Sequence, residues 1–570
     1  MATGSRDWKA IAAAKRESIL QSIPEQWRLQ NPIPPPSELR NVTGSYIQQF
    51  LNSREIEITE TDAVEIAKKT TSGQWTAVEV TKAFCHRASI AHQLVNCLHE
   101  IFFDAAIADA ERLDAYYAIN RKPIGPLHGL PVSLKDQFHV KGVETTMGYL
   151  GWIGTFQGNK ADPRKGVFES ELVRELRALG AVLYCKTSVP TTLMSGETAN
   201  HIIGYTYNPT NRLVSAGGSS GGEGSLIALG GSPVGIGSDI GGSVRIPAAY
   251  NGLYGLRPSA GRIPYEGTAN SIDGQNTLLS VLGPLATTAG ALKLVFKSVL
   301  SQQPWLYDPL ALEIPWRDAV EQETLELVNK STASQGQLAF AVVRHNNVVH
   351  PHPPVARAVQ IVAQVLGRLG HKMIDWNPPS HAEAAALADA SYHLDGGADV
   401  RKHYALSGEE VLPQFKWIYK SPDEPQKLAS EIAAINVSKR EYQKRYMDYW
   451  NSTVNETGTG RPVDGVISPI SPFAAARPDE HMHLDYTFFV NTLDYTSVVF
   501  PVTHADRAID VVDAAFEPLN SEDKKVQDNY DPKLYHGAPV GLQLVGRRLQ
   551  EEKMLVLAEH IGEAVARGKE

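Results

Sequence analysis

The residues with the clearest potential for chemistry lie between Ser215 and Arg245. These 31 residues contain 11 of the 46 glycines in the chain, together with seven serines. A serine hydroxyl can attack a carbonyl carbon, and glycine lets backbone N–H groups approach a ligand closely. A flexible linker has a similar composition, but the apolar runs 226–229 and 233–236 belong in a core. We therefore expect packed structure that presents its backbone to a ligand.

Phosphate is an unsuitable ligand for this segment. A P-loop requires the pattern GxxxxGK[ST], and no lysine occurs between Ser215 and Arg245. The dinucleotide pattern GxGxxG fails as well, because Ile240 stands where the third glycine would follow Gly235 and Gly237. Serine chemistry is the better hypothesis.

Ser219 is one candidate nucleophile. Residues 217–221 read GGSSG and match GxSxG, the nucleophile elbow of α/β-hydrolases. The elbow requires a strand that leads directly into the serine, and residues 211–216 have only a weak strand pattern. The 18 histidines of the chain leave room for the later histidine of such a triad, so this alternative stays open.

Ser243 is the other candidate. Residues 233–238 predict a strand, residues 239–242 a tight turn, and Ser243 the first turn of a helix that tolerates Pro247. Unpaired N–H groups at a helix start can stabilise an oxyanion, and the two glycines before Ser243 would let a carbonyl substrate reach them. An ordinary serine cap on a glycine turn is the alternative.

Further motifs connect this segment to a known family. The motifs LKD at 134–136, GGSSGG at 217–222 and GSDIGGSVRIP at 237–247 resemble the amidase signature family, including its separation of 24 residues between Ser219 and Ser243. The resemblance covers about residues 60–565 and continues through KTSVP at 186–190, GYTYNP at 204–209, YGLRP at 254–258, GP at 283–284, YHGAPV at 535–540 and QLVG at 543–546. The phrases GLPVSLKD at 129–136, HPHPP at 350–354 and YHGAP at 535–539 are most similar to fungal acetamidase-type general amidases. One departure is Ser238, at a position that is often threonine, and it keeps the hydroxyl.

The resemblance implies a Ser-cisSer-Lys triad. Ser243 would be the nucleophile, Ser219 the proton relay and Lys135 the base. A lysine has an ordinary pKa near 10.4, so it acts as a base near neutral pH only if burial lowers that value by several units. The apolar residues around Lys135 would supply this burial. Without the two serines, a salt bridge from Lys135 to Asp136 or Asp239 would be the simpler interpretation.

The resemblance also implies the groups that surround the triad. The oxyanion hole would consist of four consecutive backbone N–H groups, those of Ile240, Gly241, Gly242 and Ser243. Ser220 would support Lys135 or the turn, and Asp239 with Arg245 would fix the loop. No cofactor and no metal are implied.

The activity implied is hydrolysis of small carboxylic amides to an acid and ammonia or an amine through an acyl-enzyme. Carbamates and aryl or indole acetamides remain alternative substrates of the same triad. Alternatives of another class are an α/β-hydrolase-type esterase with Ser219 as nucleophile, a non-catalytic scaffold subunit, and a transamidating subunit of a larger complex.

A metal hydrolase is disfavoured by the motifs. His350 and His352 are close in sequence, but the chain has no HExxH and no paired CxxC. A His-Pro-His in a proline-rich turn is more often structural. The SxxK match at 521–524 lies in a charged stretch and is interpreted as chance.

Composition limits the partners and the compartment. The chain has 570 residues, 42% of them hydrophobic, and 63 acidic against 54 basic side chains give a net charge of −9. The mild acidity argues against nucleic acid or an anionic membrane as the main partner. Three cysteines form no disulfide framework, and no signal-peptide or membrane-spanning run is recognised. We expect a cytoplasmic enzyme for a small-molecule amide, as a monomer or a homodimer.

Alternating strands and helices predict an α/β fold. Strands are expected at 130–135, from residue 181, at 338–343 and at 539–545, with helices between or after them, and residues 61–120 are expected to be helical. The strands at 338–343 and near Trp376 enclose a helix, so they should pair in parallel. The family resemblance implies a single large α/β/α domain around a many-stranded mixed sheet. We predict a helical arm at 1–60 and this domain at 61–570, with a peripheral insertion at about 303–462.

Overall fold

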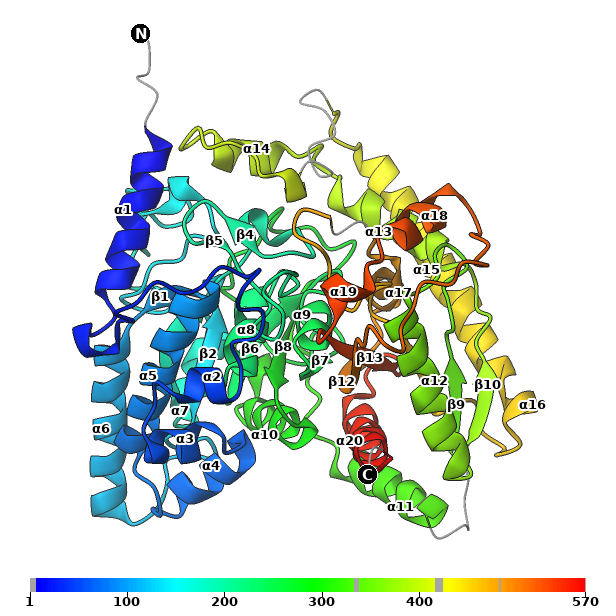
Figure 1. Cartoon of the computed structure of the whole chain (residues 1–570), viewed down its shortest axis with the longest axis horizontal. Coiled ribbons are helices and arrows are strands. Elements are labelled where there is room, and N and C mark those ends of the chain that lie inside the picture. The colour runs from blue at the N-terminus through cyan, green and yellow to red at the C-terminus, as the bar shows by residue number, and fades with distance from the viewer. Residues whose placement is uncertain (1–6, 333–337, 416–423, 481–482, 569–570) are drawn as a thin grey trace.

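The computed structural model describes residues 7–332, 338–415, 424–480 and 483–568. In this part of the chain, 11 strands form one mixed sheet through the centre of the molecule (Figure 1), and β4 and β5 form a separate pair. In their order across the sheet, the strands are β1 (Leu98–Ile101), β3 (Val182–Thr187), β2 (Pro131–Lys135), β6 (Val234–Asp239), β8 (Val281–Ala286), β7 (Tyr254–Arg257), β12 (Ser497–His504), β13 (Pro539–Val545), β11 (Gly465–Ser468), β9 (Ala339–Val342) and β10 (Lys372–Asp375). The separate pair is β4 (Ala199–Asn200) with β5 (Gly204–Tyr205).

Helices make up most of the remaining regular structure. The α-helices are α1 (Trp8–Gln21), α2 (Ser45–Gln48), α3 (Ser53–Thr59), α4 (Ala63–Thr71), α5 (Ala77–Val95), α6 (Phe103–Asn120), α7 (Glu171–Ala178), α8 (Gly221–Ala228), α9 (Arg245–Tyr250), α10 (Ala289–Leu300), α11 (Asp318–Thr332), α12 (Pro353–Arg368), α13 (His381–Tyr392), α14 (Ala398–Tyr404), α15 (Ala429–Ser452), α16 (Val454–Thr457), α17 (Asp485–Leu493), α18 (Ser521–Asp528), α19 (Pro532–Tyr535) and α20 (Glu551–Arg567). Short 3-10 turns are η1 (Glu25–Trp27), η2 (Leu150–Trp152), η3 (Thr191–Leu193), η4 (Pro304–Leu306) and η5 (Pro413–Phe415).

The strand pairing confirms the predicted mixed sheet. Strand β2 pairs in parallel with β3 and β6, and β9 pairs in parallel with β10 and β11. The other neighbouring strands in the sheet are antiparallel. The parallel pair β9 and β10 enclose α12, as the alternating pattern predicted. Both strands come from the region 303–462 and lie at one end of the sheet.

Helices pack on this sheet in two groups. Helices α8 and α9 contact each other, and between them they contact β6, β7, β12 and β13. Helices α10, α12 and α20 form a second connected group, in which α10 contacts β8 and α20 contacts β12. The strands of the sheet are almost entirely buried apart from β10. Most of their apolar residues belong to one core, and those of β1 and part of β3 belong to a second hydrophobic cluster.

Two predictions about local structure were wrong. The segment 61–120 is not helical throughout, because Leu98–Ile101 forms β1 at the edge of the sheet and pairs antiparallel with β3. Its polar His99 and Glu100 are buried, so the strand lacks the alternating pattern that identifies a half-exposed strand. Helix α9 begins at Arg245 and not at Ser243. The reason lies in the contacts of Asp239, described below.

The N-terminal helix α1 is anchored by ion pairs near the β1 edge of the sheet. Lys15 Nζ lies 2.7 Å from Glu100 Oε1 and 2.8 Å from Glu144 Oε2. Arg16 Nε donates to the carbonyl oxygen of Ile202 at 2.8 Å. The helical N-terminal arm predicted from the sequence is therefore present and is held against the rest of the chain.

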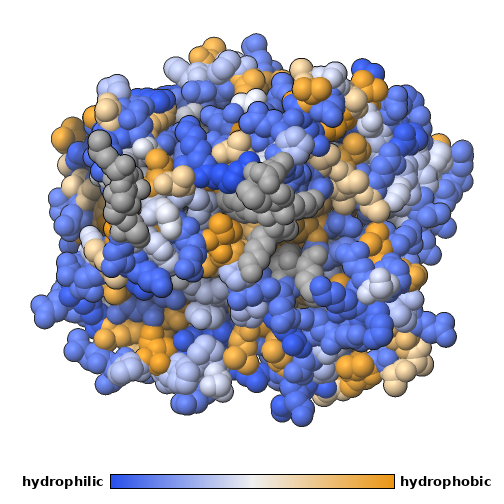
Figure 2. Space-filling model, turned by 90° about the horizontal axis from the view of Figure 1, so that it is seen from above, coloured by the Kyte–Doolittle hydropathy of each residue, from blue (hydrophilic) through white to orange (hydrophobic). Residues whose placement is uncertain are grey.

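The face of the molecule seen in Figure 2 is polar over much of its area. In the view of Figure 2, hydrophilic residues dominate, and hydrophobic residues occur in separate groups. None of the helices in the described ranges combines the length and the apolar composition that a bilayer span requires.

Candidate active site

Lys135 lies at the carboxyl end of β2, beside the carboxyl end of β6. The two strands pair in parallel, which brings Lys135 close to Ser238 in β6. Lys135 Nζ donates to Ser219 Oγ at 2.7 Å and to Ser238 Oγ at 2.8 Å. The lysine side chain is fully buried. The sheet therefore places the Lys135 amine beside the hydroxyl groups of Ser219 and Ser238, away from bulk water.

Burial makes this amine much less basic than an ordinary lysine. Removal from water lowers the pKa of Lys135 to about 7, although the negative charges of Asp239 and Glu223 act in the opposite direction. Lys135 does not pair with either aspartate that the simpler interpretation named. Asp136 pairs with Lys186 at 2.9 Å, and Asp239 pairs with Arg245. The lysine is thus suited to exchange a proton near neutral pH.

Ser219 and Ser243 come from two loops that touch each other. The Gly218–Ser219 peptide bond is cis, and the backbone N–H of Ser220 donates to the carbonyl oxygen of Ser243 at 3.2 Å. The side-chain Oγ of Ser243 makes no hydrogen bond to any residue that the structure describes. Ser243 is 8% exposed, against 1% for Ser219, so Ser243 is the hydroxyl that a substrate can reach.

A narrow pocket opens in front of Ser243. Gly218, Ile240 and Gly241 line it beside Ser243. Its other walls are largely apolar and are formed by Leu193, Met194, Ser195, Gly196, Ile246, Tyr392, Leu484 and Phe488. A short acyl group would therefore be desolvated as it approaches the serine.

Three of the four N–H groups predicted for the oxyanion hole have no acceptor among the described residues. The N–H of Gly242 donates to Asp239 Oδ1 at 2.8 Å, so it is not available to a substrate. No described residue accepts a hydrogen bond from the N–H of Ile240, Gly241 or Ser243. Because the Asp239 carboxylate also accepts from the N–H of Val244, the chain wraps around it before α9 begins. The free donors thus belong to a loop and not to a helix N-terminus.

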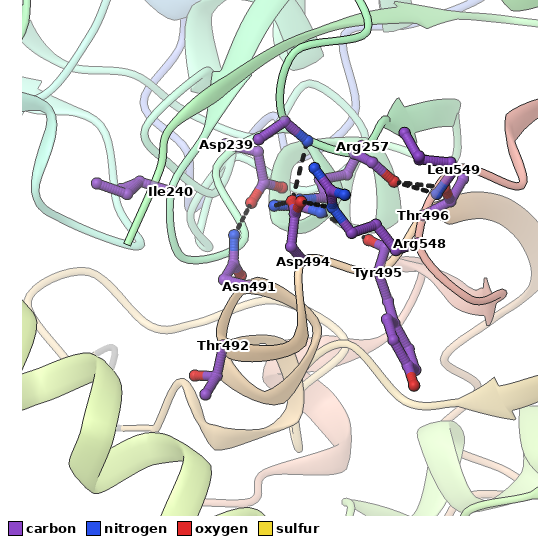
Figure 3. A network of polar contacts seen from close by, with 12 residues as sticks. Asp239, Ile240, Arg257, Asn491, Thr492, Asp494, Tyr495, Thr496, Arg548 and Leu549 are labelled. Atoms are coloured by element: carbon purple, nitrogen blue, oxygen red, sulfur yellow. Dashed lines mark hydrogen bonds and ion pairs between the residues drawn. The ribbon is translucent and has the colours of Figure 1, made fainter. Parts of the chain in front are cut away.

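Asp239 and Arg245 form the buried support of this loop. Arg245 Nε lies 3.0 Å from Asp239 Oδ2, and Arg245 Nη2 lies 3.1 Å from Asp239 Oδ1. Burial alone would raise the pKa of Asp239, but Arg245 holds it well below its usual range. Figure 3 shows Asn491 turned toward Asp239, to which its Nδ2 donates at 2.8 Å. Arg257, Asp494 and Arg548 extend the polar network beyond this point.

Ser220 lies at the turn and not on Lys135. Its Oγ is 3.5 Å from the carbonyl oxygen of Ser238 and 3.4 Å from the N–H of the same residue. Ser238 instead takes the place beside Lys135, and its Oγ donates to Gln137 Oε1. The hydroxyl noted in the sequence at Ser238 was the only signal for this contact.

A buried carboxyl group beneath Lys135 had no signal in the sequence. Glu223 in α8 accepts from Ser133 Oγ at 2.5 Å and from Thr187 Oγ1 at 2.9 Å. Burial raises the pKa of Glu223 to about 8, against the effect of these hydrogen bonds. A Cβ atom at Gly235 would lie 1.8 Å from Glu223 Oε2, so glycine at 235 makes room for the carboxyl group.

The α/β-hydrolase geometry is not found at Ser219. In the described residues, no strand leads into Ser219, whose Oγ is engaged by Lys135. The residues 211–216 form only an isolated bridge at Ser215. A nucleophile elbow would require both the missing strand and a free serine.

His350 and His352 have structural partners. His350 Nδ1 lies 2.7 Å from Asp523 Oδ2, and His352 Nε2 lies 2.8 Å from the carbonyl oxygen of Val526. Within the described ranges, no three His, Cys, Asp or Glu side chains gather in a way that could hold a metal ion.

Comparison with known proteins identifies the family of this chain. The family model named Amidase matches residues 79–555. The chain belongs to the amidase signature family. It is accordingly an amide hydrolase, built on the α/β fold with a large mixed sheet that its relatives share.

Fungal acetamidases are among the most similar relatives of this amidase. An acetamidase of Aspergillus oryzae is 44% identical over 563 residues, which is 98% of this chain and 99% of the relative. An acetamidase of Emericella nidulans is 43% identical over 557 residues, covering 98% of each chain. The resemblance to acetamidases inferred from short phrases is thereby confirmed at the level of the whole chain.

Among solved structures, a fatty acid amide hydrolase has a TM-score of 0.88 and 32% identity, and the match covers 98% of this amidase and 95% of that chain. A bacterial aryl acylamidase has a TM-score of 0.66 at 20% identity, which shows a common fold.

Proposed function

We propose that this amidase hydrolyses small carboxylic amides with Ser243 as nucleophile, Ser219 as proton relay and Lys135 as base. The observation that carries the proposal is the 2.7 Å contact between the buried Lys135 Nζ and Ser219 Oγ. The loop of Ser219 contacts the loop of Ser243, because the N–H of Ser220 donates to the carbonyl oxygen of Ser243. An amide needs an activated nucleophile, a stabilised oxyanion and a protonated leaving nitrogen. These residues can supply all three.

Acylation begins with neutral Lys135. In this form the amine keeps its donation to Ser238 and accepts the proton of Ser219 Oγ, while Ser219 takes the proton of Ser243 Oγ. Ser243 Oγ forms a bond to the amide carbon, and the carbonyl oxygen becomes an oxyanion. The N–H groups of Ile240, Gly241 and Ser243 stabilise that charge. The proton then returns through Ser219 to the amide nitrogen, the C–N bond breaks, and ammonia or an amine leaves.

Deacylation repeats this path with water. Water loses a proton through Ser219 to Lys135 as its oxygen attacks the ester carbon of the acyl-enzyme. The proton returns to Ser243 Oγ as the ester bond breaks, and the acid is released. The enzyme finishes in its starting protonation state, so no cofactor is needed to balance either half-reaction.

A short acyl group is favoured by the shape of the pocket. Tyr392 and Phe488 close one side of the narrow space before Ser243, and Tyr392 Oη is fixed by donation to the carbonyl oxygen of Ile240 at 2.9 Å. The two acetamidases that cover almost the whole chain are named for a two-carbon amide. Both facts support small aliphatic amides over longer ones.

The purified single chain tests this proposal. We expect release of ammonia from acetamide and propionamide, without partner subunits and without added metal. A panel that includes hexanamide, an aryl acetamide, indole acetamide and a carbamate ester ranks the alternative substrates by kcat/KM. Activity on none of the amides, or activity only when a partner chain is added, would contradict the proposal.

Phe488→Leu is expected to widen the acyl preference. Because Phe488 lines the pocket, a smaller side chain should raise the ratio of kcat/KM for hexanamide over acetamide by roughly 10-fold. The matched control is Phe489→Leu, since Phe489 is the next residue of α17 but stacks on His381 outside the pocket. An equal change of the ratio in both variants would show that Phe488 does not set acyl length.

A reducing compartment fits the cysteines. Cys85, Cys97 and Cys185 are all free and buried. Disulfides are rare in the cytosol and common in secreted proteins. We therefore retain the cytoplasm as the proposed location.

A further inference from the structure

Helix α17 directly contacts the loop 240–243, which carries the proposed oxyanion donors, although the two segments are far apart in the sequence. We call residues 240–243 the oxyanion loop. Thr487 Oγ1 is within hydrogen-bonding distance of the carbonyl oxygen of Gly241, at 2.6 Å, across a separation of 246 residues. The same hydroxyl is 2.8 Å from the carbonyl oxygen of Leu484, one turn earlier in the chain. A residue with no catalytic motif thus contacts the loop that carries the free N–H donors.

The peptide unit between Gly241 and Gly242 is held at both of its polar atoms. Its carbonyl oxygen accepts from Thr487, and its N–H donates to Asp239 Oδ1 at 2.8 Å. The N–H groups of Gly241 and Ser243 flank this unit. Fixing the plane of the central peptide therefore fixes the directions of the donors on either side of it.

The loop packs closely against the helix. A Cβ atom at Gly242 would lie 2.8 Å from Thr487 Cγ2 and Oγ1, and one at Gly241 would lie 2.8 Å from Phe488 Cε1. Gly242 also has a φ of +121°, which L side chains rarely adopt. The close packing of this loop on α17 therefore requires glycine at both positions.

Asn491, one turn after Thr487, contacts the other side of the same support. Its Nδ2 donates to Asp239 Oδ1 at 2.8 Å, and its Oδ1 accepts from Arg245 Nη2 at 2.6 Å. Helix α17 therefore reaches both the carbonyl and, through Asp239, the N–H of the central peptide. Contacts from α17 thus act on both polar atoms of the peptide between Gly241 and Gly242.

We infer that Thr487 is a positioning residue that orients the oxyanion donors by holding the carbonyl of Gly241. This inference rests on the proposed function, because it assigns those N–H groups to the oxyanion. Such donors act chiefly on the transition state, so their misplacement lowers kcat while substrate binding changes little.

The test compares three variants of α17. Thr487→Val removes the hydroxyl with little change of shape, and Thr487→Ser keeps it. Thr492→Val is the matched control, since Thr492 is also buried and donates to a carbonyl, that of Ala384 at 3.0 Å. Figure 3 shows Thr492 directed away from the network around Asp239.

Thr487→Val is expected to lower kcat for acetamide by roughly 10- to 100-fold, with KM changed less than about twofold. Thr487→Ser should restore kcat to within about threefold of the wild type, and Thr492→Val should resemble the wild type. Unchanged kcat in Thr487→Val, an effect confined to KM, or an equal loss in Thr492→Val would overturn the inference.

A second readout separates this inference from the proposed function. The rate of covalent labelling by a fluorophosphonate depends on the same donors but not on amide turnover. Labelling of Thr487→Val should be roughly 10-fold slower than labelling of Thr492→Val. If the wild type hydrolyses no amide, the proposed function fails, and the labelling rates still decide whether Thr487 orients the loop. Equal labelling rates in the two variants would refute its positioning role.

Discussion

Replacing Ser243 with alanine is expected to reduce kcat for acetamide hydrolysis by roughly 10⁴-fold or more, because loss of the nucleophile in a serine hydrolase removes the covalent pathway. The hydroxyl makes no hydrogen bond to a described residue, so its removal leaves no buried partner unpaired. The free energy of unfolding should change by less than about 1 kcal/mol. Ammonia release and thermal unfolding, measured on the same preparation, check both expectations.

Ser232→Ala is the matched control for this variant. Ser232 is a buried serine of the same glycine-rich segment, and its Oγ donates to Val234 away from the pocket. Its removal should leave kcat close to that of the wild type. If Ser243→Ala kept near wild-type turnover while Ser219→Ala lost it, Ser219 would be the nucleophile and our assignment would be wrong.

Lys135→Met is expected to lower kcat/KM by roughly 10³-fold or more. It should also remove the acid limb of the pH profile, which is the fall of kcat/KM at low pH. The base must be neutral, and burial lowers the pKa of Lys135 to about 7. In the wild type, kcat/KM should therefore be highest above pH 7 and fall about tenfold per pH unit below it. A pH profile of kcat/KM from pH 5 to 9 measures this limb.

Glu223→Gln decides which group produces that limb. The pKa of Glu223 is raised to about 8, so its carboxyl group titrates close to Lys135, whose pKa is about 7. With glutamine, Lys135 should still titrate and the limb should remain, because the Glu223 carboxyl group is already mostly protonated at pH 7. Disappearance of the limb in Glu223→Gln would assign it to the carboxyl group and contradict the role of Lys135.

The fold of Lys135→Met should not be weakened. Between pH 7 and the ordinary lysine value of 10.5, the unfolded chain binds a proton at Lys135 that the folded chain lacks. The contribution of Lys135 therefore makes the folded state more stable as pH rises through this window. Methionine removes this penalty, so thermal unfolding at pH 7 separates loss of chemistry from loss of structure.

The catalytic candidates could be predicted because they lie in local motifs. Lys135 and the two serines stand in short phrases with a fixed spacing, and the strands β2 and β6 that carry or precede them have clear apolar patterns. The sequence also predicted that Lys135 must be buried, because only burial gives a lysine a suitable pKa.

The supporting groups could not be predicted in the same way. Thr487 and Asn491 lie in an ordinary helix, and only the folded chain brings them beside Gly241 and Asp239. The hydrogen bond from the N–H of Gly242 to Asp239 depends on the side-chain conformation of Asp239, which the spacing of residues does not reveal. For the same reason, the sequence predicts too early a start for α9, at Ser243 and not at Arg245.

The two glycines before Ser243 have a second role, which is in packing. From the sequence, we interpreted Gly241 and Gly242 as an opening through which a carbonyl group reaches the backbone. The structure shows that Cβ atoms there would collide with Phe488 and Thr487. These glycines therefore serve the packing of α17 on the loop, and the loop in turn faces the pocket.

The most direct test of the central claim is to identify the serine that reacts with a fluorophosphonate. This reagent forms a covalent bond only with an activated serine, so the labelled peptide reports the nucleophile itself. Mass spectrometry of the digested wild-type chain should find the label on Ser243, and Lys135→Met should label far more slowly. Label on Ser219, or on any serine other than Ser243, would contradict the account.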